Sequence, residues 1–224
     1  MREFEKKIGY EFRNKHLLST ALCHSSYANE SKKGLQSNER LEFLGDSVLS
    51  IVVSEYLYKH FSHMPEGELT KFRASLVCEK SLHKQALKLN LGEYLMLGKG
   101  EELTGGRQRP SILADAVEAV IAAIYLDSNL EQARKFILGM LHDDMVPEKL
   151  EEAKDYKTIL QEIIQQNREE KITYCLVEET GPDHDKRFTV EVRLNSNVIG
   201  TGTGRSKKDA EQAAAREALA LMGE

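Results

Sequence analysis

Hydrophobic residues recur at helical spacing through the first two thirds of the chain. Between residues 41 and 52 the apolar positions follow a period of about 3.6 residues. A second run, Ala114 to Leu126, is long, apolar and rich in alanine. The four prolines all fall between such segments, where the missing N–H of proline does least harm. This pattern predicts an all-helical region from Phe4 to Leu141.

The periodicity changes after Pro147. Residues 148–154 are polar and form a stretch short enough to link two compact units. Asp155 can cap a helix whose apolar stripe runs from Tyr156 to Ile164 at helical spacing. The sequence therefore predicts a second unit that begins at residue 155.

Strand-like segments follow the first helix of this second unit. They cover residues 172–178 and 187–194, and the turn Gly181-Pro182-Asp183 separates them. We expect a short third strand near Val198 and Ile199, and a final helix from about Ser206 to Met222. The order α-β-β-β-α predicts an antiparallel three-stranded sheet covered on one face by two helices.

Composition narrows the class of protein. No run approaches the roughly 18 apolar residues of a membrane span, and the opening Met1–Lys7 lacks a secretory signal, so we expect a cytoplasmic protein with no membrane association. The three cysteines form no CxxC pair, and no histidine spacing is typical of zinc sites. Any metal should be held by oxygen. The net charge of −5 restricts nucleic-acid binding to local basic clusters.

Two segments place acidic side chains on shared helix faces. Glu42 and Asp46 are four residues apart, which puts them on one face about 6 Å apart along the helix axis. Glu39 lies one turn earlier on a similar face. Asp115 and Glu118 are three residues apart within the alanine-rich apolar run. Two acids on an otherwise apolar helix need a partner.

These acids have two interpretations. They can form solvated faces or pair with Arg40, Lys71 or Arg73, which is the usual fate of acids at helical spacing. This interpretation is weaker for Asp115 and Glu118, because unpaired carboxylates among apolar residues lose hydration and repel each other. A divalent cation removes both costs. Oxygen ligands without thiolate or imidazole favour Mg²⁺, with Mn²⁺ as a substitute.

A basic pair lies at the start of the last predicted helix. Ser206 can cap that helix, and Asp209 can complete a capping box around Lys207 and Lys208. Lysines there oppose the helix dipole, and a polyanion reverses that penalty, so the pair can clamp phosphate. A solvated pair is the alternative. Residues 200–204 have GxGxG spacing outside a βαβ unit, which predicts no nucleotide cofactor.

The sequence resembles a known family over essentially its whole length. Asn38-Glu39-Arg40-Leu41-Glu42-Phe43-Leu44-Gly45-Asp46 resembles the signature of the bacterial ribonuclease III family, and residues 98–119 resemble its second conserved block. Residues 202–215 resemble the C-terminal signature of double-stranded-RNA-binding domains, and residues 181–188 resemble their minor-groove loop. The resemblance implies an all-α nuclease domain over residues 1–147, a linker over 148–154 and an α+β double-stranded-RNA-binding domain over 155–224.

The resemblance also assigns roles to the acids. Four of them match the family's metal-associated positions: Glu42, Asp46, Asp115 and Glu118. Asp46 and Glu118 match the essential catalytic positions, and Glu39 and Glu66 match further acids near the active site. The implied reaction is Mg²⁺-dependent hydrolysis of double-stranded RNA, which leaves 5′-phosphate and 3′-hydroxyl ends with short 3′ overhangs. The implied substrates are ribosomal RNA precursors and other structured RNAs, including messenger and transfer RNA.

Partners follow from the same resemblance. The implied RNA contacts are made by the polar face of the first helix, the loop and the last helix, at Thr158, Gln161, Glu162, Gln165, His184, Ser206, Lys207 and Lys208. A homodimer is implied because one acidic cluster serves one strand, whereas a duplex has two. Phe43 matches an aromatic that packs into the partner subunit. From the sequence alone Phe43 can equally be intrachain core.

Two rival functions remain at this stage. A non-catalytic RNA-binding scaffold would have lost a metal-binding acid, and none of the four is lost. An acidic helical enzyme acting on a small phosphorylated substrate would not need the C-terminal RNA-binding pattern. His24, Ser25 and Ser26 lack the nucleophile elbow and ordered triad of a serine hydrolase, so we interpret them as structural.

Overall fold

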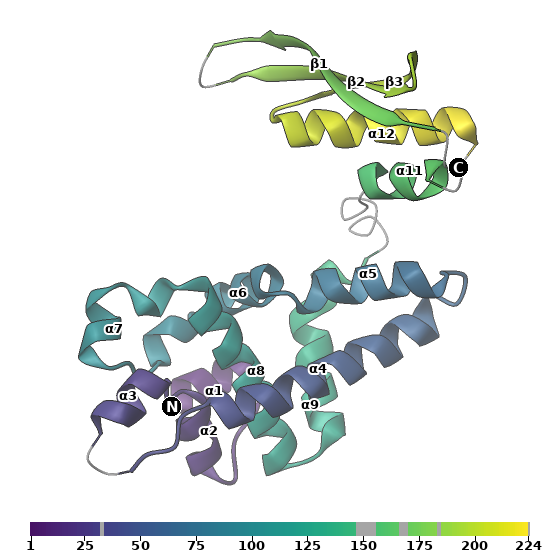
Figure 1. Ribbon diagram of the computed structural model, residues 1–224. Coiled ribbons are helices and arrows are strands. Elements are labelled where there is room, and N and C mark those ends of the chain that lie inside the picture. Colours follow the sequence, from purple (N-terminus) through teal and green to yellow (C-terminus); the bar gives the residue numbers. More distant parts are fainter. Residues whose placement is uncertain (32–33, 147–155, 166–169, 183–184, 224) are drawn as a thin grey trace. The chain divides into compact units, whose positions relative to one another are not determined.

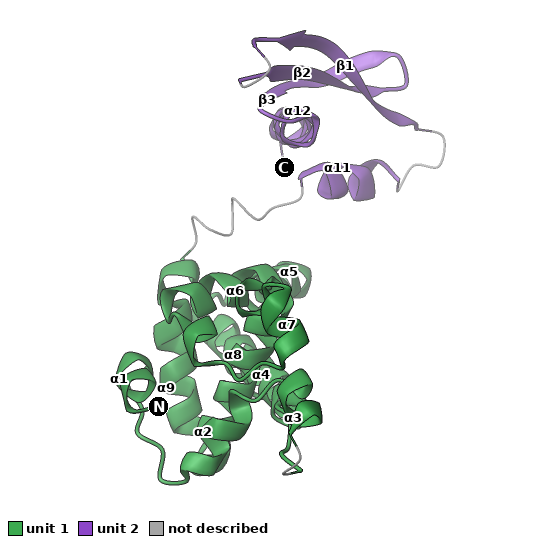
Figure 2. Cartoon of the chain, turned by 90° about the vertical axis from the view of Figure 1, so that its left-hand side faces the viewer, with its two compact units in different colours: residues 1–153 green, residues 154–224 purple. Residues whose placement is uncertain are grey.

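The chain forms two compact units, residues 1–153 and 154–224 (Figures 1 and 2). The structure is a computed structural model that describes residues 1–31, 34–146, 156–165, 170–182 and 185–223. The expected linker, residues 148–154, and the expected cap Asp155 lie outside the described residues. Each unit has its own hydrophobic core, so each is described by itself.

Unit 1 is built from helices, as the sequence predicts. Its α-helices are α1 (Arg2–Ile8), α2 (Lys15–Ala21), α3 (Ser25–Glu30), α4 (Glu39–His60), α5 (Glu66–Val77), α6 (Glu79–Lys88), α7 (Lys99–Leu103), α8 (Pro110–Asp127) and α9 (Leu130–Leu141). Short 3₁₀ turns are η1 (Leu91–Tyr94), η2 (Gly106–Gln108) and η3 (His142–Asp144). Extended pairing in the described part of this unit is limited to a parallel bridge between Cys23 and Met96.

Helix α8 lies at the centre of unit 1 (Figure 1). Every residue from Ile112 to Ile124 is buried except Asp115 and Glu118, which are half-buried. This burial on all sides explains why the run has no polar face. Pro110 begins the helix at a position where no backbone N–H is needed.

Helix α4 packs directly along α8, and Gly45 makes the close approach possible. A Cβ atom at Gly45 would collide with the backbone carbonyl of Glu118. Only glycine therefore lets the two backbones come this close. Because Gly45 lies between Glu42 and Asp46 on α4, the contact brings both acids toward the acids of α8.

Unit 2 has the expected order α-β-β-β-α. Its elements are α11 (Tyr156–Ile164), β1 (Ile172–Thr180), β2 (Arg187–Leu194), β3 (Asn197–Gly204) and α12 (Lys207–Met222). The strands form an antiparallel sheet in the order β1-β2-β3. Helix α12 packs on the sheet and α11 packs against α12 (Figure 1). Leu160, Val192 and Ala214 are among the buried residues that join the two layers.

Strand β3 is longer than the sequence predicts. We expected a short strand near Val198 and Ile199, but pairing with β2 continues through the glycines to Gly204. A Cβ atom at Gly200 or Gly202 would collide with the backbone of α12 at Ala214. The absence of side chains at these glycines therefore lets α12 lie directly on the strand. From the sequence alone, alternating glycines suggest a loop, which is why the expected strand was too short.

Candidate active site and RNA-binding surface

Acidic side chains of α4 and α8 meet within unit 1. Carboxylate oxygens of Glu42, Asp115 and Glu118 lie within 4.8 Å of one another, and all three residues are half-buried. Asp46, exposed one turn further along α4, is close enough for its charge to raise the pKa of Glu118. The four acids predicted from the sequence as metal-associated are thus brought together from two helices about 70 residues apart in the chain.

Burial and mutual repulsion raise the pKa values of this cluster. Loss of hydration, followed by the charges of Asp46, Asp115 and Glu42, raises the pKa of Glu118 to about 8. Burial and then the charge of Asp115 raise the pKa of Glu42. Burial and then the charge of Glu79 raise the pKa of Asp115. The cluster is therefore short of positive charge, which is the condition that a bound cation relieves.

Basic side chains do not supply that charge. Among the described residues, none of the four acids forms an ion pair with lysine or arginine. Arg73, one of the partners considered from the sequence, instead donates a hydrogen bond to Ser54 Oγ at 3.3 Å. Pairing with basic residues therefore does not explain the cluster.

The two supporting acids expected from the sequence differ in position. Glu39, in the first turn of α4, is exposed, and its charge raises the pKa of Glu42, so it borders the cluster. Glu66 begins α5 and accepts a hydrogen bond from Thr70 Oγ1 at 2.9 Å. No interaction between Glu66 and the cluster is found among the described residues.

Sequence reasoning missed two neighbours of Asp115. Glu79, the first residue of α6, raises the pKa of Asp115, whereas His24 lowers it. The only local signal at Glu79 is that of an acid in the first turn of a helix, which is an ordinary helix-stabilising feature. Its approach to Asp115 depends on the packing of α6 against α8, which no local pattern encodes.

The start of α12 carries the pair of lysine side chains predicted from the sequence in unit 2. Ser206 Oγ accepts the backbone N–H of Asp209 at 3.1 Å and donates to the Asp209 carboxylate at 2.8 Å, so the cap predicted from the sequence is present. Lys207 and Lys208 are exposed in the first turn. The Lys207 ammonium lies 5.9 Å from the centre of the Phe188 ring, which joins the helix start to β2.

The other expected RNA contacts lie on or near α11. Gln161, Glu162 and Gln165 are exposed and Thr158 is half-buried, whereas Leu160 on the opposite face is fully buried. The polar face predicted from the sequence is therefore on the outside of the unit. His184, expected in the β1–β2 loop, lies outside the described residues.

Comparisons with known proteins identify both units. A ribonuclease-III-like family model matches residues 14–145, and a double-stranded RNA binding motif matches residues 156–222. The chain is 56% identical to Ribonuclease 3 of Caldanaerobacter subterraneus subsp. tengcongensis over 98% of its own length and 96% of that protein. It is 53% identical to Ribonuclease 3 of Clostridium perfringens, over 99% and 94% respectively. The chain belongs to the ribonuclease III family.

Membership of the ribonuclease III family confirms the resemblance, the fold class and the enzyme class expected from the sequence. The chain is an endoribonuclease of double-stranded RNA, and its family depends on a divalent metal ion. Unit 1 is also similar to the crystal structure of the ribonuclease III nuclease domain from Campylobacter jejuni. The TM-score is 0.60 and the identity 45%, covering 65% of this chain and 95% of that one. Every helix in the described residues is too short or too polar to cross a membrane.

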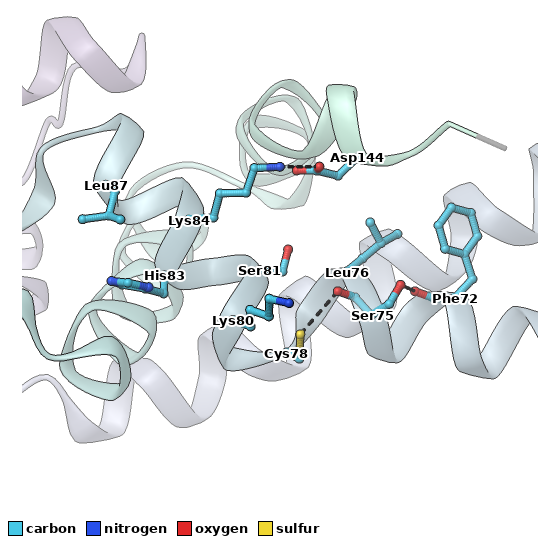
Figure 3. Close-up of a pocket in the computed structure, with 10 residues that line it drawn as sticks. All are labelled: Phe72, Ser75, Leu76, Cys78, Lys80, Ser81, His83, Lys84, Leu87 and Asp144. Atoms are coloured by element: carbon cyan, nitrogen blue, oxygen red, sulfur yellow. Dashed lines mark hydrogen bonds and ion pairs between the residues drawn. The ribbon is translucent and has the colours of Figure 1, made fainter. Parts of the chain in front are cut away.

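Unit 1 also carries a hollow of about 610 Å³ that is separate from the acidic cluster (Figure 3). It is lined by residues of α5, α6 and η3 and by Cys78 between α5 and α6: Phe72, Ser75, Leu76, Cys78, Lys80, Ser81, His83, Lys84, Leu87 and Asp144. Lys84 Nζ lies 2.6 Å from an Asp144 carboxylate oxygen, and Cys78 Sγ donates to the Ser75 carbonyl at 3.4 Å. None of the four clustered acids lines this hollow, so it is not the candidate active site.

Proposed function

We propose that this ribonuclease III is a homodimeric enzyme that cuts double-stranded RNA with Mg²⁺ held by four acids: Glu42, Asp46, Asp115 and Glu118. The observation that carries the proposal is the convergence of three carboxylates to within 4.8 Å, without an ion-pair partner among the described residues. All the donors are oxygen atoms, which favours Mg²⁺, with Mn²⁺ as a substitute.

The acids have distinct tasks in this proposal. Glu42 and Asp115 face each other from α4 and α8 and hold the cation, and Glu118 binds it after losing a proton. Asp46, which is more exposed, acts with Glu118 as the second essential catalytic acid. When bound, the cation supplies an activated water nucleophile and stabilises the departing 3′ oxygen. The expected products have 5′-phosphate and 3′-hydroxyl ends with short 3′ overhangs.

A direct test uses a plain RNA duplex incubated with the full chain in Mg²⁺, in Ca²⁺ and in EDTA. We expect cleavage in Mg²⁺ alone, with 5′-phosphate ends on both strands, and no cleavage of the matching DNA duplex. Cleavage that persists in EDTA, or products that carry 3′-phosphate, would contradict the proposal. Ribosomal RNA precursors and other structured RNAs, including messenger and transfer RNA, are the proposed natural substrates, and the cytoplasm is the proposed location.

Metal binding should release a proton near neutral pH. The pKa of Glu118 is raised to about 8, so most of its carboxyl is protonated at pH 7 in the metal-free protein, whereas a ligand must be ionised. Calorimetry of Mn²⁺ binding at pH 7, in buffers of different ionisation enthalpy, should therefore detect proton release. The affinity should rise with pH until about pH 8 and then level off. An affinity that is constant from pH 6 to pH 8 would contradict the expectation.

The RNA-binding surface of the proposal lies on unit 2. Thr158, Gln161, Glu162 and Gln165 on α11 reach the 2′-hydroxyl groups of a shallow minor groove. Ser206, Lys207 and Lys208 bind phosphate at the start of α12, where backbone N–H groups also point outward. His184 is proposed as a contact of the neighbouring loop. Six of these side chains are exposed around α11 and α12, which supports the assignment: Gln161, Glu162, Gln165, Ser206, Lys207 and Lys208.

Replacing Lys207 and Lys208 with alanine should weaken binding to all RNA duplexes alike. Affinity for RNA falls as salt rises, and loss of two phosphate contacts should make the slope of log affinity against log salt shallower by roughly 2. The affinity itself should fall by roughly tenfold. Fluorescence anisotropy in Ca²⁺ at several salt concentrations measures both quantities. Lys171→Ala, an exposed lysine before β1, is the matched control. An unchanged affinity and slope would place the RNA surface elsewhere.

The dimer surface of the proposal lies on α4. Phe43, Ile51 and Tyr58 recur on one side of the helix and are 78%, 56% and 76% exposed. This exposure excludes Phe43 from the intrachain core, which was the alternative from the sequence. A second solved structure of the C. jejuni nuclease domain, 45% identical to this chain, is described as showing flexibility in a region involved in dimer formation. An exposed apolar stripe of this kind supports burial against a second copy.

A further inference from the structure

A second hollow in unit 1 shares no lining residue with the hollow of Figure 3. Its volume is about 350 Å³, and it is lined by residues of α1, α6, α9 and η3 and by Leu89 after α6. Its lining includes none of the four clustered acids and no residue of the exposed stripe on α4. The proposed function therefore gives this hollow no role.

Three lysines from three helices border the hollow: Lys7 on α1, Lys88 on α6 and Lys135 on α9. Asp143 is the only acid in the lining, and its carboxylate lies 3.5 Å from Lys88 Nζ. Lys7 Nζ lies 5.4 Å from the centre of the uncharged Tyr94 ring, and Lys135 forms no ion pair with any described residue. The lining thus has an excess of positive charge in a chain of net charge −5, and such a hollow attracts anions.

Apolar side chains supply most of the remaining lining. Ile8 is buried, and Leu89, Phe136 and Met140 are partly buried. Small-molecule sites typically combine a mainly apolar lining with a few charged groups, at volumes of about 300 to 1,000 Å³. This hollow lies at the lower end of that range, so it has room for one small ligand. An RNA duplex carries its phosphates on a convex surface and cannot enter it.

Gly139 leaves part of the hollow open. It lies inside α9, where glycine destabilises a helix relative to alanine. A Cβ atom at Gly139 would meet no other atom within 4 Å, in contrast to Gly45, so the packing of the helix does not require glycine here. Because Gly139 lines the hollow, a larger side chain at this position would occupy space within it. The missing side chain therefore serves the hollow and not the packing of α9.

We propose that this hollow binds a small organic phosphate, of the size of a nucleoside monophosphate. The phosphate group lies among Lys7, Lys88 and Lys135, and the apolar part of the ligand lies against Phe136 and Met140. Lysine ammonium groups bind phosphate through charge-assisted hydrogen bonds, which are stronger than those between neutral groups. Such a ligand binds apart from the acidic cluster and is not a cofactor of cleavage.

Calorimetry of the full chain with adenosine 5′-monophosphate (AMP) in EDTA is the test. EDTA removes metal ions that could hold AMP at the acidic cluster. We expect AMP to bind more tightly than inorganic phosphate, which lacks the apolar part, and more tightly than adenosine, which lacks the charge. Absence of AMP binding, or binding of inorganic phosphate as tight as that of AMP, would overturn the inference.

Charge substitutions locate the bound phosphate. Lys135→Ala should weaken AMP binding by about tenfold, because a charge-assisted hydrogen bond is lost. Asp143→Asn removes the carboxylate that competes for Lys88, so AMP should bind about threefold more tightly. Lys6→Ala is the matched control, because Lys6 is exposed on α1 but does not line the hollow. Wild-type AMP affinity in Lys135→Ala would contradict the site.

A steric substitution tests the hollow itself. Gly139→Leu fills part of it, whereas Gly139→Ala adds a single methyl group. Both variants should unfold above the wild-type temperature, because leucine and alanine favour a helix more than glycine does. Gly139→Leu should bind no measurable AMP, and Gly139→Ala should still bind it. AMP binding by Gly139→Leu at wild-type affinity would overturn the inference, as would a loss of RNA-duplex affinity in Lys135→Ala, which would assign the lysine to RNA.

Discussion

Replacing Glu118 with glutamine is expected to slow RNA cleavage by about a thousandfold or more while duplex affinity stays within about twofold of wild type. The change keeps the size of the side chain but removes a charge from a cluster of acids that lie within 4.8 Å of one another. Loss of metal stabilisation worth about 4 kcal/mol in the transition state corresponds to that factor. The RNA contacts proposed on unit 2 are untouched.

Single-turnover cleavage in Mg²⁺ and anisotropy in Ca²⁺ separate the two effects. Glu131→Gln, an exposed acid near the start of α9, is the matched control and should cleave like wild type. Turnover of Glu118→Gln at the wild-type rate would remove Glu118 from the mechanism. A parallel loss of affinity and rate would instead indicate that the substitution disturbs the fold.

The same substitution should stabilise the metal-free protein at alkaline pH. The pKa of Glu118 is about 8 in the folded chain and near 4.5 in the unfolded chain, so the folded state holds the extra proton. The free energy of unfolding of wild type therefore falls as pH rises from about 4.5 to 8, and a glutamine does not share this loss. In EDTA at pH 8 we expect Tm to rise by a few degrees. A Tm difference that is the same at pH 5 would contradict this cause.

Local patterns predicted the elements of both units because periodicity and capping are properties of neighbouring residues. The helical run of α8 and the cap at Ser206 were visible in the sequence and are present in the structure. The predicted length of strand β3 was too short because glycine is usually a sign of a loop. Its alternating glycines instead leave room for the backbone of α12 to pack against the strand. This contact joins two separate segments of the chain, so a local sequence pattern does not reveal it.

The candidate site could be predicted only in part. Asp115 and Glu118 stood out because their neighbours are apolar, and their partners on α4 followed from the family resemblance. Nothing local indicated that Gly45 sets the separation of the two helices, or that His24 and Glu79 act on Asp115. Such effects depend on which helices pack together, and sequence spacing within one helix carries no information about that.

Replacing Phe43 with alanine is expected to convert the proposed dimer into a monomer. An aromatic side chain that is 78% exposed on an isolated subunit is an anchor for an interface, and truncating such an anchor costs about 2 to 4 kcal/mol. A two-fold interface contains the residue twice, so the loss counts twice and the dimer dissociation constant should rise by about a thousandfold or more. Sedimentation velocity over a range of concentrations measures the shift.

Leu103→Ala is the matched control for Phe43→Ala, because Leu103 is 87% exposed on α7 and does not belong to the stripe on α4. It should leave the dimer intact. The cleavage pattern supplies a second readout: a dimer places one acidic cluster at each strand, whereas a monomer has a single cluster and should nick one strand at a time. Products of Phe43→Ala should therefore shift from duplexes with short 3′ overhangs toward nicked duplexes. The proposed dimer would be contradicted if the wild-type chain sediments as a monomer at micromolar concentration and still makes paired cuts. A second acidic cluster would then be unnecessary for cutting both strands.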